Sequence, residues 1–298
     1  MKRVTTYTVI AGNKICPQDC PICIAEMTPD YGIGNKQPEI NWEKFRKATQ
    51  IALNHGAQNV LITGKGEPTL FPFNISRYLM ELEGKPFDRR ELQTEGSLLA
   101  RGGFYDGFLE EWHYLGLDTV AVSIYHYEAE RNKEIFRPAY GRYFDLPKLV
   151  KKINSKGLST RLSCVMLNGY TDSVEEVKRL IGFAKENDVF QLTLRMADKP
   201  LKIVEKGNDM AKYRGEFVDE HRLSERKLKD IADFLEADGT KCDVMPHGAT
   251  VYEIDDQNVC LTTGLTQDGG KDDVRQLIFY PPDWLTTSWE NVKGGRIL

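Results

Sequence analysis

The stretch Cys16-Pro-Gln-Asp-Cys20-Pro-Ile-Cys23 places three cysteines in a CxxxCxxC spacing near the start of the chain. Three thiols so close in sequence converge only if the chain loops around a shared ligand. Thiolates suit zinc, copper(I) or an iron–sulfur cluster. Structural zinc sites and standard cubane clusters take four protein ligands, so this triplet leaves one coordination position for something else.

A second motif, Gly64-Lys-Gly-Glu-Pro68, follows the next expected strand, residues 59–63. Glycines at a strand end let the backbone approach a ligand closely. Taken alone, this motif would be read as a plain turn ending at Pro68. The cysteine triplet alone is also compatible with a zinc knuckle that borrows a fourth ligand such as His55. The occurrence of both motifs in one chain favours a combined site.

Together the two motifs resemble those of the radical S-adenosylmethionine (radical SAM) superfamily, over roughly residues 5–200. The resemblance implies that Cys16, Cys20 and Cys23 bind three irons of a [4Fe–4S] cluster, while the amino and carboxylate groups of SAM bind the fourth. The chain departs from the family pattern at two positions. Ile22 precedes the third cysteine, where an aromatic residue is common, and Lys65 splits the usual pair of glycines.

The resemblance also implies which residues contact SAM. The segment Gly64, Lys65, Gly66 and Glu67 is expected to accept hydrogen bonds from the SAM ammonium, through backbone carbonyls and the Glu67 carboxylate. Further contacts are expected from residues at or just past later strand ends: Thr94, Ser123, Ser163, Asn168 and Arg195. Arg195 could alternatively clamp an anionic substrate, or face outward and pair with a helix. His126 could line the cavity, but a structural histidine is the better interpretation.

Short apolar segments alternate with helical patterns along the first 240 residues. The expected strands are 5–11, 59–63, 90–94, 118–124, 160–167 and 189–196. The expected helices are 42–55, 75–83, 106–115, 146–155, 173–187 and 225–237. Six such repeats imply an α/β fold with a parallel sheet. The resemblance implies a partial (β/α)6 TIM-like barrel, whose active site lies at the carboxyl ends of the strands.

The sequence changes character near residue 240. Short strand patterns at 251–254, 258–263, 275–280 and 285–289 predict a small C-terminal β-rich extension, with a mobile loop at 267–273. We therefore expect two domains, a barrel over residues 1–239 and a possible cap over 240–298. Cys242 and Cys260 are too few to hold a second cubane.

Composition limits the class of protein. A chain of 298 residues with 41% hydrophobic residues can bury a sizeable core, and its six cysteines do not form a disulfide pattern. A reducing, cytoplasmic location is therefore expected, and no signal peptide or membrane span is visible. The net charge of −4 and the lack of a long basic run do not favour a nucleic-acid partner.

The resemblance implies reductive cleavage of SAM at the cluster to methionine and a 5′-deoxyadenosyl radical, which abstracts hydrogen from a substrate. A reductant protein such as flavodoxin or ferredoxin would supply the electron. A small-molecule substrate is favoured over RNA or a peptide. The alternatives are a radical SAM enzyme that modifies RNA or a peptide, and a non-catalytic iron–sulfur protein for electron transfer or binding. The sequence does not identify a catalytic residue that acts on the substrate.

Overall fold

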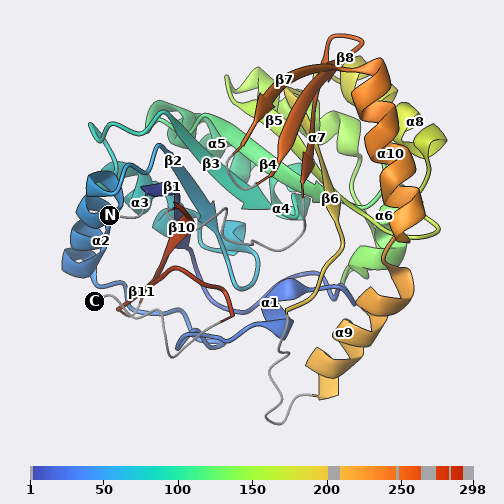
Figure 1. Ribbon diagram of the computed structural model, residues 1–298. Coiled ribbons are helices and arrows are strands. Elements are labelled where there is room, and N and C mark those ends of the chain that lie inside the picture. The colour runs from blue at the N-terminus through green and yellow to red at the C-terminus, as the bar shows by residue number, and fades with distance from the viewer. Residues whose placement is uncertain (1–2, 201–208, 246–247, 263–272, 282, 291–298) are drawn as a thin grey trace.

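One eleven-stranded sheet organises the computed structural model, which describes residues 3–200, 209–245, 248–262, 273–281 and 283–290. The strand order is β11-β10-β1-β2-β3-β4-β5-β6-β9-β8-β7. Strands β1 to β6 pair in parallel with their sequence neighbours. The sheet curves into an open barrel with helices on its outside (Figure 1). The α/β class and the partial TIM-like barrel are therefore confirmed.

The strands of the barrel wall are β1 (Arg3–Ile10), β2 (Asn59–Thr63), β3 (Arg89–Thr94), β4 (Thr119–Ile124), β5 (Ser159–Met166) and β6 (Gln191–Met196). The later strands are β7 (Thr240–Val244), β8 (Thr250–Ile254), β9 (Gln257–Thr262), β10 (Asp273–Tyr280) and β11 (Trp284–Thr286).

The first helices are α1 (Ile24–Met27), α2 (Trp42–Asn54), the 3₁₀ turn η1 (Pro68–Leu70), α3 (Pro72–Glu81), α4 (Ser97–Arg101) and α5 (Phe104–Tyr114). The remaining helices are α6 (Ala129–Phe136), α7 (Leu146–Ser155), α8 (Val174–Glu186), α9 (Asp209–His221) and α10 (Glu225–Asp238).

Alternation along the strands separates the core from the barrel interior. Ile62 of β2 is buried in the main hydrophobic core, whereas its neighbours Leu61 and Thr63 line an interior cavity. This is the two-residue period of a strand. Large buried aromatics such as Tyr7 fill the layer between sheet and helices. The helices therefore hold the wall in shape and leave the interior free for polar side chains.

Local signals in the sequence fix several helix ends. The Asn41 side chain accepts a hydrogen bond from the Lys44 amide at the start of α2, and Ser173 does the same for Glu176 in α8. Both are N-caps, which are worth about 0.5–2 kcal/mol each. Gly56 follows α2 with a φ of 85°, a left-handed conformation that other residues adopt only at an energetic cost. The spacing of Ser173 and Glu176 predicts this second cap from the sequence alone.

The strands after residue 240 extend both edges of the barrel sheet. Strand β9 pairs in parallel with β6, and β10 pairs in parallel with β1. The antiparallel strands β7, β8 and β11 then widen the two edges. The loop expected at 267–273 falls largely outside the described residues. Whether residues 240–298 act as a separate cap remains a prediction.

Six elements were not expected from the sequence: α1, η1, α4, α6, α9 and β7. The most consequential is α9, because it packs against α1 (Figure 1). Helix α1 directly follows residues 16–23, which we call the cysteine loop. Its segment 209–221 carries a glycine and many charges, which weakens its helical pattern. In the described part of the chain, no helix is both long enough and apolar enough to span a bilayer.

Candidate functional site

The cysteine loop and the Gly64–Pro68 segment meet at the carboxyl ends of the barrel strands. They line one pocket of about 550 Å³, together with polar residues from β3 to β6. The predicted site residues on this pocket are Cys16, Cys20, Cys23, Gly64, Lys65, Gly66, Glu67, Thr94, Ser123, Ser163 and Arg195. Residues about 180 positions apart in sequence thus share one cavity. The pocket is open enough for a ligand larger than a metal ion.

Asn168 is the predicted site residue that the structure does not bring to this pocket. Its side chain is exposed, and its Oδ1 accepts a hydrogen bond of 2.6 Å from the Lys227 amine. The Asn168 amide donates to the carbonyl of His221, which links the loop after β5 to the end of α9. The position just past the strand end therefore turns outward in this chain.

The cysteine loop is anchored by its own backbone. The amide of Asp19 donates to the Phe136 carbonyl at the end of α6, and the amide of Cys23 donates to the Cys20 carbonyl. From α9, the Arg214 guanidinium donates to the Cys20 carbonyl and pairs with Asp19 at 2.8 Å. Arg214 is a buried residue of the site that sequence analysis did not identify. Its only signal was one arginine within a charged segment.

The donor set fits a cluster with three protein ligands. Burial, and then the charge of Glu67, raise the pKa of the Cys16 thiol above its ordinary value. Burial, and then Cys23, raise the pKa of Cys20, while a hydrogen bond from Tyr125 opposes the shift. A metal that binds these thiols must therefore displace their protons. Among the described residues, no group of His, Cys, Asp and Glu is arranged around a single metal ion. A cluster has several irons, so its ligands need not meet at one point.

Gly64 and Gly66 are required by the packing of the two motifs. A Cβ atom on Gly66 would lie 2.2 Å from the carbonyl oxygen of Ile15, and one on Gly64 would lie 2.7 Å from that of Gly66. The neighbouring amide of Glu67 donates to the Ile15 carbonyl at 2.9 Å. The glycines therefore let the segment lie directly against the cysteine loop.

Glu67 ties the ends of two strands together. Its Oε1 accepts hydrogen bonds from the amide and hydroxyl of Thr69 and from the hydroxyl of Thr94, and its Oε2 accepts from the amide of Glu95. Burial nevertheless raises the pKa of this carboxyl. The Oε2 atom keeps further acceptor capacity, because it has two lone pairs and accepts one hydrogen bond from the described residues. It can therefore serve both as a structural brace and as an acceptor for a cationic ligand.

Glu95 is a second buried carboxyl on the same pocket. Burial and the neighbouring charge of Glu67 raise the pKa of Glu95 to about 8. Its Oε2 accepts a hydrogen bond of 2.5 Å from Gln18 in the cysteine loop. Two adjacent carboxyl groups in one cavity favour a positively charged ligand. The ammonium and sulfonium groups of SAM match this requirement.

Lys65, the residue between the two glycines, points to α1. Its amine donates hydrogen bonds to the carbonyls of Ala25 and Thr28 and to the hydroxyl of Thr28, at 2.7, 3.2 and 2.7 Å. These acceptors lie at the C-terminal end of α1, where carbonyls lack helical partners and attract positive charge. Burial lowers the pKa of Lys65 to about 8. Lys65, which stands where the family usually has a glycine, thus supplies a side chain that holds α1, the helix directly after the cysteine loop.

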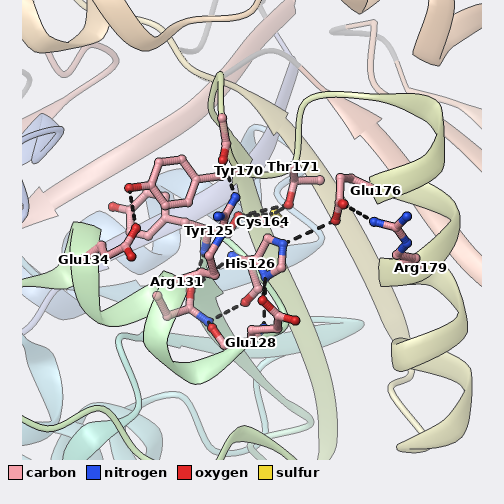
Figure 2. A network of polar contacts seen from close by, with 12 residues as sticks. Tyr125, His126, Glu128, Arg131, Glu134, Cys164, Tyr170, Thr171, Glu176 and Arg179 are labelled. Atoms are coloured by element: carbon pink, nitrogen blue, oxygen red, sulfur yellow. Dashed lines mark hydrogen bonds and ion pairs between the residues drawn. The ribbon is translucent and has the colours of Figure 1, made fainter.

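The far wall of the pocket is held by the network in Figure 2. The Asn132 side chain accepts from the amides of Tyr125 and His126, and the hydroxyl of Thr171 donates to the Tyr125 carbonyl. His126 is buried, and its Nε2 lies 3.3 Å from the carboxylate of Glu176. These bonds fix the chain directly after β4, next to Ser123 of the pocket. His126 therefore has the structural surroundings expected for it.

A family model described as the radical SAM superfamily matches residues 12–181 of the chain. No curated protein sequence matches the chain. Among solved structures, SuiB of Streptococcus suis covers 99% of this chain and 63% of its own, with a TM-score of 0.59 at 15% identity. SuiB bound to its precursor peptide SuiA covers 78% of this chain and 52% of its own, with a TM-score of 0.51 at 18% identity.

A further structure, native anSMEcpe with bound AdoMet, covers 78% of this chain and 61% of its own, with a TM-score of 0.54 at 17% identity. The chain thus spans between about half and two thirds of the length of these three structures. At these identities the likeness concerns the fold.

Proposed function

Because this chain belongs to the radical SAM superfamily, we propose that it is an enzyme that cleaves SAM reductively and abstracts hydrogen from a small-molecule substrate. Members of the family use a [4Fe–4S] cluster and SAM. The observation that carries the proposal is the shared pocket: the three cysteines, the Gly64–Glu67 segment and two buried carboxyl groups all border it. When bound, the cluster and SAM supply a one-electron cleavage that yields a hydrogen-abstracting species.

Different residues would bind the cluster, bind SAM and position the cysteine loop. Cys16, Cys20 and Cys23 would hold three irons and leave the fourth open. Glu67 and Glu95 would balance the positive charges of SAM. The hydrogen bonds of Lys65 to α1 and those of Arg214 to Cys20 and Asp19 would keep the cysteine loop at a fixed distance from these carboxyl groups. A reductant protein such as flavodoxin or ferredoxin would deliver the electron.

The size of the interior supports a small substrate. A cavity of about 360 Å³ inside the barrel adjoins the pocket at Gln93 and Arg195, and both volumes lie in the range of sites for small ligands. Peptide modification is the second candidate, because SuiB is known with a bound precursor peptide and its fold is similar. It predicts that hydrogen abstraction requires a peptide.

The test is anaerobic reconstitution with iron and sulfide, followed by dithionite and SAM without added substrate. We expect about four irons per chain and slow formation of 5′-deoxyadenosine, detected by chromatography. A variant with Cys16, Cys20 and Cys23 all changed to Ala should lose both. Intact SAM in the presence of a reduced cluster would contradict the proposal and favour an electron-transfer protein.

A further inference from the structure

The interior of the barrel carries an excess of positive charge. The charged residues that line the 360 Å³ cavity are Lys65, Arg89, Glu91, Arg161, Arg195 and Arg275. Glu91 is the one carboxylate among these described lining residues, and it is paired with Arg161. A structural ion-pair network in a buried place is normally balanced, because an uncompensated charge there is costly. Among the described residues that line it, the cavity therefore has more positive than negative charge, and an anion would balance it.

Three arginines from three strands converge in this cavity. Arg161 lies on β5, Arg195 on β6 and Arg275 on β10. Their convergence is evident at Cys260 of β9, because each of the three guanidinium groups acts on the pKa of this one thiol, which burial raises overall. Burial, and then repulsion from Arg161 and Arg275, lower the pKa of Arg195 to about 10. Arg195 is thus close enough to both Arg161 and Arg275 to be repelled by each of them.

Each of these arginines also has a buried polar atom without a partner among the described residues. These atoms are Nε of Arg161, Nε of Arg195 and Nη1 of Arg275, and the buried hydroxyl of Thr193 in the same cavity also has none. An unsatisfied buried donor costs about 1–3 kcal/mol. Carboxylate and phosphate oxygens are the acceptors that guanidinium groups fit best, often in pairs of parallel bonds. Four unused donors around one cavity therefore indicate a bound acceptor with several oxygens.

We infer that the Arg161, Arg195 and Arg275 cluster binds a carboxylate or phosphate group of the substrate. The inference rests on the proposed function and deepens it, since it names the chemical class of the substrate: a small anionic molecule. Arg195 and Gln93 line both this cavity and the pocket of the cysteines. An anion held on the arginines would therefore leave the rest of a small molecule directed toward the SAM pocket.

The first experiment measures anion binding without cluster, SAM or reductant. The melting temperature of the metal-free protein is followed against inorganic phosphate and against malonate, with sodium chloride keeping the ionic strength constant. We expect a saturable rise in melting temperature with at least one of the two anions. The anion that gives the rise at the lower concentration shows whether the cluster prefers phosphate or carboxylate. Arg275→Gln should weaken this binding tenfold or more. The matched control Arg46→Gln, which removes an exposed arginine paired with Glu81, should bind like the wild type.

If Arg275→Gln does not fold, Arg275→Lys and the charge-neutral pair Glu91→Gln/Arg161→Gln serve instead. Lysine keeps the charge but lacks the planar guanidinium group that binds two oxygens at once, so Arg275→Lys should also weaken anion binding. A wild-type protein that responds to neither anion would overturn the inference. So would binding that survives all of these changes, since the anion would then be held elsewhere.

The second experiment separates the substrate from SAM. SAM binding to the reconstituted protein is measured by equilibrium dialysis. We expect Arg275→Gln to bind SAM like the wild type. If it loses SAM and phosphate in equal proportion, the arginines serve the carboxylate of SAM and the substrate assignment is overturned. Failure of the proposed function would show differently, as absent SAM cleavage in the wild type with anion binding intact.

Discussion

The side-chain amine of Lys65 lies 2.7 Å from the hydroxyl oxygen of Thr28, so a buried hydrogen bond joins the Gly64–Pro68 segment to the end of α1, the helix that follows the cysteines. The same amine also donates to the carbonyls of Ala25 and Thr28 in this helix end. A residue that appeared to interrupt a glycine pair therefore helps to set the position of the cysteines.

Replacing Lys65 by Met should remove this brace while keeping most of the side-chain volume. The acceptors on Ala25 and Thr28 would lose their partner, which costs about 1–3 kcal/mol. We expect a lower free energy of unfolding in urea and a lower iron content after reconstitution. The control Lys36→Met changes an exposed lysine and should alter neither. Full iron content in Lys65→Met would show that the brace does not matter for the cluster.

Replacing Arg214 by Gln should loosen the cysteine loop from the side of α9. The change removes hydrogen bonds from a charged donor to Cys20 and Asp19, each worth about 1.5–3 kcal/mol. Iron should be lost to a chelator roughly tenfold faster than from the wild type. Lys212→Gln, on an exposed position of the same helix, is the matched control. Equal rates of iron loss in the two variants would refute the role of Arg214.

Gly66→Ala should separate the two motifs. Its Cβ would meet the Ile15 carbonyl at 2.2 Å, which forces the backbone apart and costs about 1–3 kcal/mol. We expect weaker SAM binding in equilibrium dialysis, with the melting temperature lowered. Gly34→Ala is the control, because a Cβ at Gly34 meets nothing within 4 Å among the described atoms. Unchanged SAM affinity in Gly66→Ala would place SAM away from this segment.

His126 should make stability depend on pH. Burial, opposed by Glu128 and Glu176 and assisted by Arg131, lowers the pKa of His126 below its ordinary value of 6.5. The unfolded chain therefore takes up a proton first as the pH falls. The contribution of His126 to stability is present above pH 6.5 and is lost as the pH falls below it.

His126→Gln keeps one donor and one acceptor but does not titrate. We expect the difference in unfolding free energy between wild type and His126→Gln to shrink from pH 7.5 to pH 5.5, measured by urea denaturation. A difference that stays constant over this range would mean that His126 does not titrate on unfolding.

Local features of the sequence predict most of the barrel and the core of the site. Ser173 at an N-cap and Gly56 at a helix end are readable because a helix start or stop depends on nearby residues. The cysteine triplet and Gly64–Pro68 meet because parallel strands bring their carboxyl ends to one rim. In contrast, the role of Lys65 depends on where α1 ends, and that of Arg214 depends on α9 packing against α1. Such contacts are set by tertiary structure, as is the outward turn at Asn168.

The pairing of β10 with β1 has a consequence for synthesis on the ribosome. Thr8 of β1 bonds to Gln276 of β10, which lies 268 residues later. At a synthesis rate of about 5–20 residues per second, one edge of β1 stays unpaired for roughly 10–50 seconds before β10 is made. An exposed strand edge invites pairing with other chains during that time. Nascent copies of this protein should therefore depend on chaperone protection until β10 has emerged.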